Sequence, residues 1–154
     1  NMTNLEHKIP PPLVAVMCGL VIWWLAGTTP GVVDPYGVAQ PLAVLVAIMG
    51  LVFDSGGVLA FVKQKTTVNP IQINQASSLV TSGLYRYSRN PMYLGMALLL
   101  TSLTIWVQAP AGLAGVGLFV AFITRFQILP EERVLESLFG KDYIAYKGRV
   151  RRWF

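Results

Sequence analysis

Four long apolar segments constrain this sequence most strongly, and nearly all of its charge lies at or beyond their ends. The segments are residues 12–26, 41–62, 92–107 and 109–128. A helix needs roughly 20 apolar residues to cross the hydrocarbon core of a membrane, with about 17 as the lower limit. The second and fourth segments meet this length, whereas the other two would require tilting or local bilayer thinning. Because lipid cannot satisfy free backbone groups, the segments predict an all-α, polytopic membrane helical bundle with four transmembrane helices.

Charged residues are scarce along the whole chain. Of 154 residues, 54% are hydrophobic and 12% are charged, about half the charged fraction of a soluble domain. We therefore expect residues 1–154 to form one integral membrane domain. The chain has one cysteine, Cys18, and one histidine, His7, so it cannot form an internal disulfide or a Cys/His metal site, and no metal is expected.

The basic residues indicate which loops face the cytoplasm. All 12 Lys and Arg residues precede the first apolar segment, lie between the second and third, or occur within or after the last part of the fourth. Residues 27–40 and the turn 108–110 contain none. Cytoplasmic loops are enriched in Lys and Arg, so we expect both termini on the cytoplasmic side, in a prokaryotic inner membrane. The net charge of +5 then reflects attraction to anionic membrane lipids and predicts no nucleic-acid partner.

The polar segment 63–91 precedes the third apolar segment and contains the first candidate site residues. It ends with Arg89, Asn90 and Pro91, a sequence typical of a helix start. Asn90 is a favourable N-cap residue, and Pro91 suits the first helical position because its missing N–H has no helical partner there.

A second polar segment, residues 129–154, follows the fourth apolar segment. Pro130 is expected to end the fourth helix and begin another, whose first turn carries Glu131 and Glu132. Further along, aromatic and apolar residues recur at helical spacing and predict C-terminal interfacial helices on the membrane surface. These residues are Tyr143, Tyr146, Val150 and Trp153.

The two polar segments are expected to meet. Segments 92–107 and 109–128 are joined by almost nothing and predict a tight antiparallel hairpin, which places Asn90 near Glu131. The groups gathered there would suit a ligand with a cationic end and a flat aromatic ring. They are Tyr85, Arg89, Asn90, Tyr93, Arg125, Gln127, Glu131 and Glu132. The alternative is that Arg89 and Arg125 pair with the two glutamates and only hold the helices together.

Two features lie inside apolar segments. Asp54 precedes Lys63 by nine residues, roughly 13 Å along a helix, and an intramembrane carboxylate is a functional candidate. It could equally cap a kink or pair with a neighbouring helix. The glycines between residues 112 and 117 follow no strand, so they indicate close helix packing and no nucleotide-binding loop.

Four motifs occur in order in the second half of the chain. They are residues 79–85 (LVTSGLY), 89–95 (RNPMYLG), 130–132 (PEE), and 139–146 (FGKDYIAY) with Arg149 and Val150. Together they resemble the isoprenylcysteine carboxyl methyltransferase family, which is related to the phospholipid methyltransferases. The resemblance covers roughly residues 63–153. It implies a membrane methyltransferase that uses S-adenosylmethionine, forms S-adenosylhomocysteine and acts on a lipophilic small molecule or lipid.

The resemblance also implies roles for individual residues. The cofactor would lie in a cytoplasmic region built from residues 63–91 and 129–154. Its binding residues would be Ser78, Leu79, Val80, Tyr85, Arg89, Asn90, Pro91 and Tyr93, with Glu131 and Glu132 holding its ammonium group. Apart from the resemblance, we expect Arg125, Gln127 or Asp54 to orient the methyl acceptor or take its proton.

Two positions depart from the family pattern. Asn90 stands where the family often has His, and an amide cannot titrate near neutral pH, so no acid–base role is expected there. Gln127 stands where carboxyl methyltransferases tend to have Arg, and Arg125 lies two residues earlier. The acceptor is therefore left open among a carboxylate, an amine, a thiol and a phospholipid.

Two other functions remain alternatives at this stage. One is a membrane reductase that uses NADPH, because sterol reductases share a related C-terminal architecture. The other is a non-enzymatic membrane helix bundle. The first predicts binding of a dinucleotide, and the second predicts that neither cofactor changes thermal stability.

Overall fold

The computed structural model describes residues 8–64 and 77–154, and every regular element in these ranges is helical. This confirms the predicted all-α fold. The elements are α1 (Pro11–Thr28), α2 (Ala39–Lys63), η3 (Gly83–Arg86), α3 (Pro91–Trp106), η4 (Pro110–Gly112), α4 (Leu113–Ile123), η5 (Thr124–Ile128), α5 (Leu129–Phe139) and α6 (Lys141–Arg149). His7 and residues 65–76 of the predicted cofactor region lie outside the described residues.

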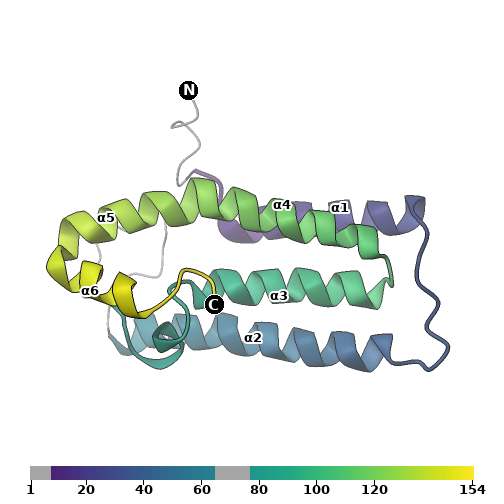
Figure 1. Ribbon diagram of the computed structural model, residues 1–154, viewed down its shortest axis with the longest axis horizontal. Helices are drawn as coiled ribbons and strands as arrows, with labels where there is room; N and C mark the ends of the chain where they lie inside the picture. Colours follow the sequence, from purple (N-terminus) through teal and green to yellow (C-terminus); the bar gives the residue numbers. More distant parts are fainter. Residues whose placement is uncertain (1–7, 65–76) are drawn as a thin grey trace.

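Helix α3 lies at the centre of the bundle and contacts α1, α2 and α4 (Figure 1). Helix α1 packs against α4 on one side, and α2 packs along α3 on the other. A buried core fills the space between α1, α3 and α4, with Ile22, Phe119 and Ile123 fully enclosed. Only residues 107–109 separate α3 from η4, so the expected tight hairpin is present.

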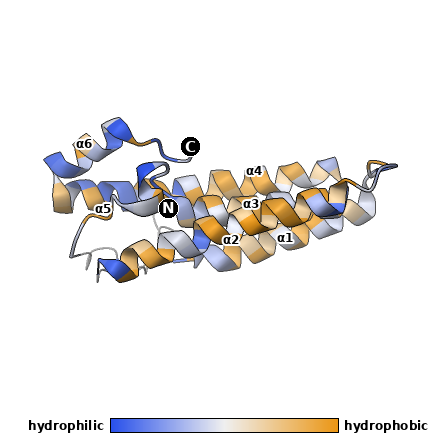
Figure 2. Cartoon of the chain, turned by 90° about the horizontal axis from the view of Figure 1, so that it is seen from below, coloured by the Kyte–Doolittle hydropathy of each residue, from blue (hydrophilic) through white to orange (hydrophobic). Residues whose placement is uncertain are grey.

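The apolar helices account for the membrane character of the chain. By length and composition, α1, α2 and the continuous helix Pro110–Phe139 could each cross a membrane, whereas α3 has 16 residues and is shorter. Large apolar side chains such as Leu20 and Trp23 point outward from these helices. Hydrophilic residues gather at the end that holds α5 and α6 (Figure 2). This arrangement fits a membrane protein, and the fourth span stays a prediction.

Helices α2 and α3 approach each other so closely that glycine is required at their contact. A Cβ atom on Gly95 would lie 2.6 Å from the Gly50 carbonyl oxygen and 2.7 Å from the Asp54 backbone nitrogen. Both are backbone atoms that cannot rotate away. Small residues allow such approaches between membrane helices, where dispersion contacts replace a hydrophobic driving force. We call this glycine contact between α2 and α3 the Gly95 seam. It also places Asp54 of α2 against α3.

The helix does not break at Pro130, contrary to the prediction. Residues 110–139 form one continuous helix, with a π-helical turn, η5, directly before Pro130. Proline lacks an N–H and clashes with the carbonyl four residues earlier. A π-turn shifts the pairing to the fifth residue, as when the Leu129 N–H bonds to the Thr124 carbonyl. The helix therefore accommodates Pro130 without a break. Glu131 and Glu132 lie on the same continuous helix as α4.

The close contact at Gly95 yields a stability prediction. Gly95→Ala should destabilise the protein by about 1–3 kcal/mol, because the added methyl group meets backbone on α2. Gly117→Ala is the matched control, since nothing lies within 4 Å of its Cβ position, and it should leave stability unchanged or slightly raised. Thermal unfolding in detergent can be followed with a thiol-reactive dye, because Cys18 is buried. Equal melting temperatures for the two variants would contradict the conclusion that glycine is required at position 95.

Candidate functional site

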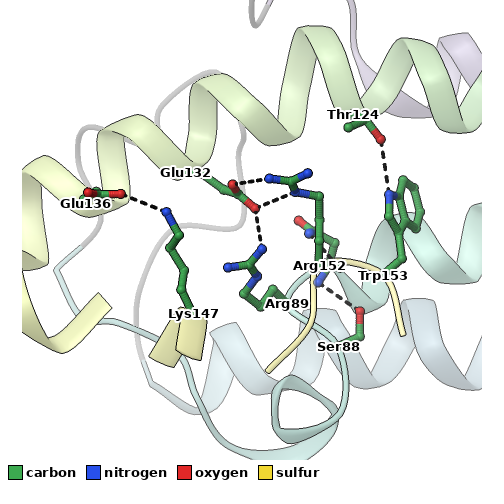
Figure 3. A network of polar contacts seen from close by, with 9 residues as sticks. Ser88, Arg89, Thr124, Glu132, Glu136, Lys147, Arg152 and Trp153 are labelled. Atoms are coloured by element: carbon green, nitrogen blue, oxygen red, sulfur yellow. Dashed lines mark hydrogen bonds and ion pairs between the residues drawn. The ribbon is translucent and has the colours of Figure 1, made fainter. Parts of the chain in front are cut away.

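Three segments that are far apart in the sequence meet beside the start of α3. They are the loop that contains η3 and leads to Asn90, the first turn of α5, and the residues after α6. Figure 3 shows polar side chains from all three pointing toward one another. The predicted meeting of the two polar segments therefore occurs, because the α3–α4 hairpin brings their ends together.

Glu132 is the centre of an ion-pair network. Its carboxylate lies 3.0 Å from Arg89 Nη2, and it accepts hydrogen bonds of 2.9 Å from both Nε and Nη2 of Arg152. The Glu132 and Arg89 side chains are only 10% and 9% exposed. Two guanidinium groups therefore neutralise this carboxylate, and its hydrogen bonds raise the pKa of Arg152. Glu132 thus joins α5 to both the loop and the C-terminal residues.

Glu131 has a different environment from its neighbour. The Tyr93 hydroxyl donates a hydrogen bond of 2.5 Å to Glu131 Oε1, and Tyr93 itself is buried. Within the described residues, Glu131 forms no ion pair. In the ranges 8–64 and 77–154, its carboxylate is therefore the one in this cluster without an ion-pair partner.

Burial gives Glu131 an unusual titration. Glu131 follows the predicted apolar span 109–128 and lies at the hydrophilic end of the bundle, with α5 and α6. Burial raises the pKa of Glu131 to about 8; the hydrogen bond from Tyr93 opposes this shift, and the charge of Glu132 adds to it. A cation placed beside Glu131 would favour the ionised form.

Asn90 is at the N-cap position of α3, but its side chain does not cap the helix. Its backbone N–H donates to the Ser88 hydroxyl at 3.1 Å, and its side-chain amide donates to the Arg152 carbonyl at 2.9 Å. The predicted capping role is therefore wrong, because the carbonyl of Arg152 draws the amide away from the helix. Pro91 is the first residue of α3, as expected, and is buried.

A second buried cluster supports the loop from the other side. Tyr143 and Tyr146 of α6 pack with Val80 and Tyr85, and the Tyr146 hydroxyl donates to the Tyr85 carbonyl at 2.7 Å. Burial raises the pKa of Tyr143 and Tyr146. The aromatic stripe packs inside the protein, so it is not the face of α6 that would meet the membrane. The interfacial position of α6 stays a prediction.

The other predicted cofactor residues belong to the same loop. Ser78 donates to Gln64 at 3.5 Å, and the Gln64 amide donates to the Ser82 hydroxyl at 3.2 Å. Leu79 packs against the second cluster beside Val80. These contacts tie the loop to the end of α2, and their part in cofactor binding stays a prediction.

The three residues predicted to handle the acceptor lie in different surroundings. Gln127 is fully buried in the π-turn, where its amide donates to the Ile9 carbonyl at 2.7 Å, and its Oε1 is buried without a partner in the described chain. The Arg125 guanidinium lies 5.4 Å from the centroid of the Phe126 ring. Asp54 is on α2 at the Gly95 seam. Their catalytic role stays a prediction.

Sequence reasoning missed four residues of this cluster: Ser88, Thr124, Arg152 and Trp153. The sequence pattern predicts Trp153 on the membrane surface, but its indole donates to the Thr124 hydroxyl at 3.2 Å. No local spacing links Arg152 or Trp153 to its partner, because the contact forms only when α6 folds back. In the ranges 8–64 and 77–154, no three His, Cys, Asp or Glu side chains are grouped to hold a metal ion.

Comparison with known proteins identifies the family. The profile of the phospholipid methyltransferases matches residues 38–142, more than half of the chain. The chain belongs to the phospholipid methyltransferase family. This confirms the membrane methyltransferase group to which the motifs pointed.

Two relatives illustrate the match. An uncharacterized protein of Haemophilus influenzae is 45% identical over 62 residues, which are 40% of this chain and 98% of the relative. A protein-S-isoprenylcysteine O-methyltransferase of Dictyostelium discoideum is 35% identical over 72 residues, which are 47% of this chain and 30% of the relative. No solved structure matches the chain.

The ion-pair network yields a second stability prediction. Glu132→Ala should destabilise the protein by about 3–5 kcal/mol, because two arginines lose a buried partner. Glu136→Ala is the matched control: it lies one turn later and pairs with Lys147 at 3.0 Å, but both side chains are well exposed, so the loss should stay below about 1 kcal/mol. Thermal unfolding of both purified variants measures the difference. Similar losses in the two would show that the buried network adds nothing.

Proposed function

We propose that this protein transfers a methyl group from S-adenosylmethionine to a lipophilic acceptor at the membrane–cytoplasm interface. The family supports the class of reaction. The Dictyostelium relative's name supports a lipophilic acceptor, although the match covers less than a third of that protein. The cofactor and the acceptor are our inference from these relationships and from the site.

One observation carries the proposal: among the residues that the structure describes, Glu131 has no ion-pair partner, whereas the adjacent Glu132 has two. S-adenosylmethionine carries an amino-acid ammonium group, the natural partner for such a carboxylate. Tyr93 donates to one oxygen of Glu131, and the ammonium group would contact the other. Glu132 would act indirectly, as a neutralised anchor of the loop. The residues present therefore fit the cofactor.

The chemistry required of the protein is limited. When bound, S-adenosylmethionine supplies an electrophilic methyl group. Glu131 would hold the ammonium end, and the side chains around Asn90 and Tyr85 would form the walls of the site. The protein's task is then to align the acceptor and exclude water, which can supply much of the rate enhancement.

The acceptor would approach from the lipid between the helices. We propose that Arg125 and Gln127 would orient it, and that Asp54 would orient it or take its proton. A basic cytoplasmic face, with both termini inside, would place the cofactor side of the site in contact with the cell's S-adenosylmethionine. The substrate would be a carboxylate, amine, thiol or phospholipid carrying a long apolar chain.

Replacing the unpaired carboxylate tests this proposal. Glu131→Gln should weaken binding of S-adenosylhomocysteine about ten- to hundredfold, because a charge-assisted hydrogen bond to the ammonium is lost. Glu136→Gln, in the same helix and exposed, should bind as the unchanged protein does. Isothermal titration calorimetry of purified protein measures both. If NADPH bound in place of S-adenosylhomocysteine, the reductase alternative would hold, and binding of neither would favour a non-enzymatic bundle.

The raised pKa of Glu131 gives a separate prediction. The ligand's ammonium favours the ionised carboxylate, so binding should release a proton below the free protein's pKa of about 8. Affinity for S-adenosylhomocysteine should therefore rise as the pH increases from neutrality toward 8. Calorimetry in buffers of different ionisation enthalpy counts the protons released. The Glu131→Gln variant should release none, and proton release that persisted in it would assign the titration to another group.

A further inference from the structure

The residues that follow α6 form a strap across the candidate site. Residues 150–154, here called the C-terminal strap, begin at Val150 in the second buried cluster and reach Trp153, which packs against the main core. The Trp153 indole bonds to Thr124 in the π-turn (Figure 3). The strap therefore connects α6 to the C-terminal end of α4 and passes beside the start of α3.

The strap holds the loop before α3 through its backbone. The Arg151 carbonyl accepts the Arg89 N–H at 3.0 Å, and the Arg152 carbonyl accepts the Asn90 side-chain amide at 2.9 Å. A carbonyl oxygen can only accept, so the Asn90 NH2 group must face the strap. The Asn90 Oδ1 then points away from this carbonyl and can accept a hydrogen bond from another group.

The Arg152 side chain acts on the other half of the site. It holds Glu132 through two hydrogen bonds of 2.9 Å, and together with Arg89 it neutralises that carboxylate. Without Arg152, Glu132 would keep only Arg89 as a partner, and its charge would act more strongly on the adjacent Glu131. That repulsion would favour protonated Glu131, which cannot hold a cation well.

We propose that Arg152 is a positioning residue that prepares Glu131 and Asn90 for the cofactor. It does so through two different groups: its guanidinium removes the competing charge beside Glu131, and its carbonyl sets the orientation of Asn90. The inference rests on the proposed function, because it assigns Arg152 to the same cofactor site. Arg152 itself touches neither the cofactor nor the acceptor.

A comparison of two ligands separates this role from simple stabilisation. S-adenosylhomocysteine carries the ammonium group, whereas 5′-methylthioadenosine has the same nucleoside without the amino-acid part. Arg152→Gln should weaken binding of S-adenosylhomocysteine about tenfold, as a shift of about one pKa unit at Glu131 would. Binding of 5′-methylthioadenosine should change by less than about twofold, so the ratio of the two affinities falls. This ratio is measured within one variant and does not depend on how much of it is folded.

The adjacent arginine provides the control. Arg151 is exposed and uses only its backbone in the strap, so Arg151→Gln makes the same charge change and should alter neither affinity. Arg152→Lys keeps the charge but cannot form the bidentate contact with Glu132. Its affinity for S-adenosylhomocysteine should lie between those of the unchanged protein and Arg152→Gln.

Each outcome has a distinct meaning. If the unchanged protein binds S-adenosylhomocysteine and Arg152→Gln weakens both ligands equally, Arg152 is only structural and the inference fails while the proposed function stands. If Arg152→Gln and Arg151→Gln bind S-adenosylhomocysteine with equal affinity, the positioning role of Arg152 is also refuted. If the unchanged protein binds neither ligand, the proposed function itself fails.

Discussion

The ion pairs of Glu132 hold together the part of the molecule that differs most from a simple helix bundle. Arg89 comes from the loop before α3, Glu132 from α5 and Arg152 from the C-terminal strap, so one carboxylate joins three separate segments. Charges that leave water lose several kcal/mol of hydration each, and only a complete set of partners offsets that loss. The three segments are therefore expected to order together, because any one of them alone would leave a buried charge unpaired.

The network also explains why two adjacent glutamates differ in character. Successive residues of a helix point about 100° apart, so Glu131 and Glu132 face different neighbours. Glu132 faces the loop and strap and meets two guanidinium groups, whereas Glu131 faces α3 and accepts a hydrogen bond from the Tyr93 hydroxyl. Within this cluster, Glu132 is thus ion-paired inside the protein, whereas Glu131 is the residue that we propose to pair with a ligand.

Much of this arrangement could be predicted from the sequence. The apolar segment 41–62 corresponds to α2 at Ala39–Lys63, and the short connection after Trp106 identified the hairpin that brings Asn90 and Glu131 to one end. These features follow from hydrophobic length and loop length, which are local properties. Local rules failed where a distant partner decided the outcome: Asn90 turned toward Arg152, the tyrosines of α6 packed against the loop, and a π-turn carried the helix through Pro130.

The unequal lengths of two neighbouring helices link the site to the surrounding bilayer. Glu131 is carried by a helix of 30 residues, whereas its partner Tyr93 lies in the first turn of a helix of 16 residues. A helix longer than the bilayer thickness tilts, whereas a shorter one thins the bilayer locally. We therefore expect membrane thickness to influence how closely Glu131 and Tyr93 approach each other, so that the lipid composition would affect the candidate site.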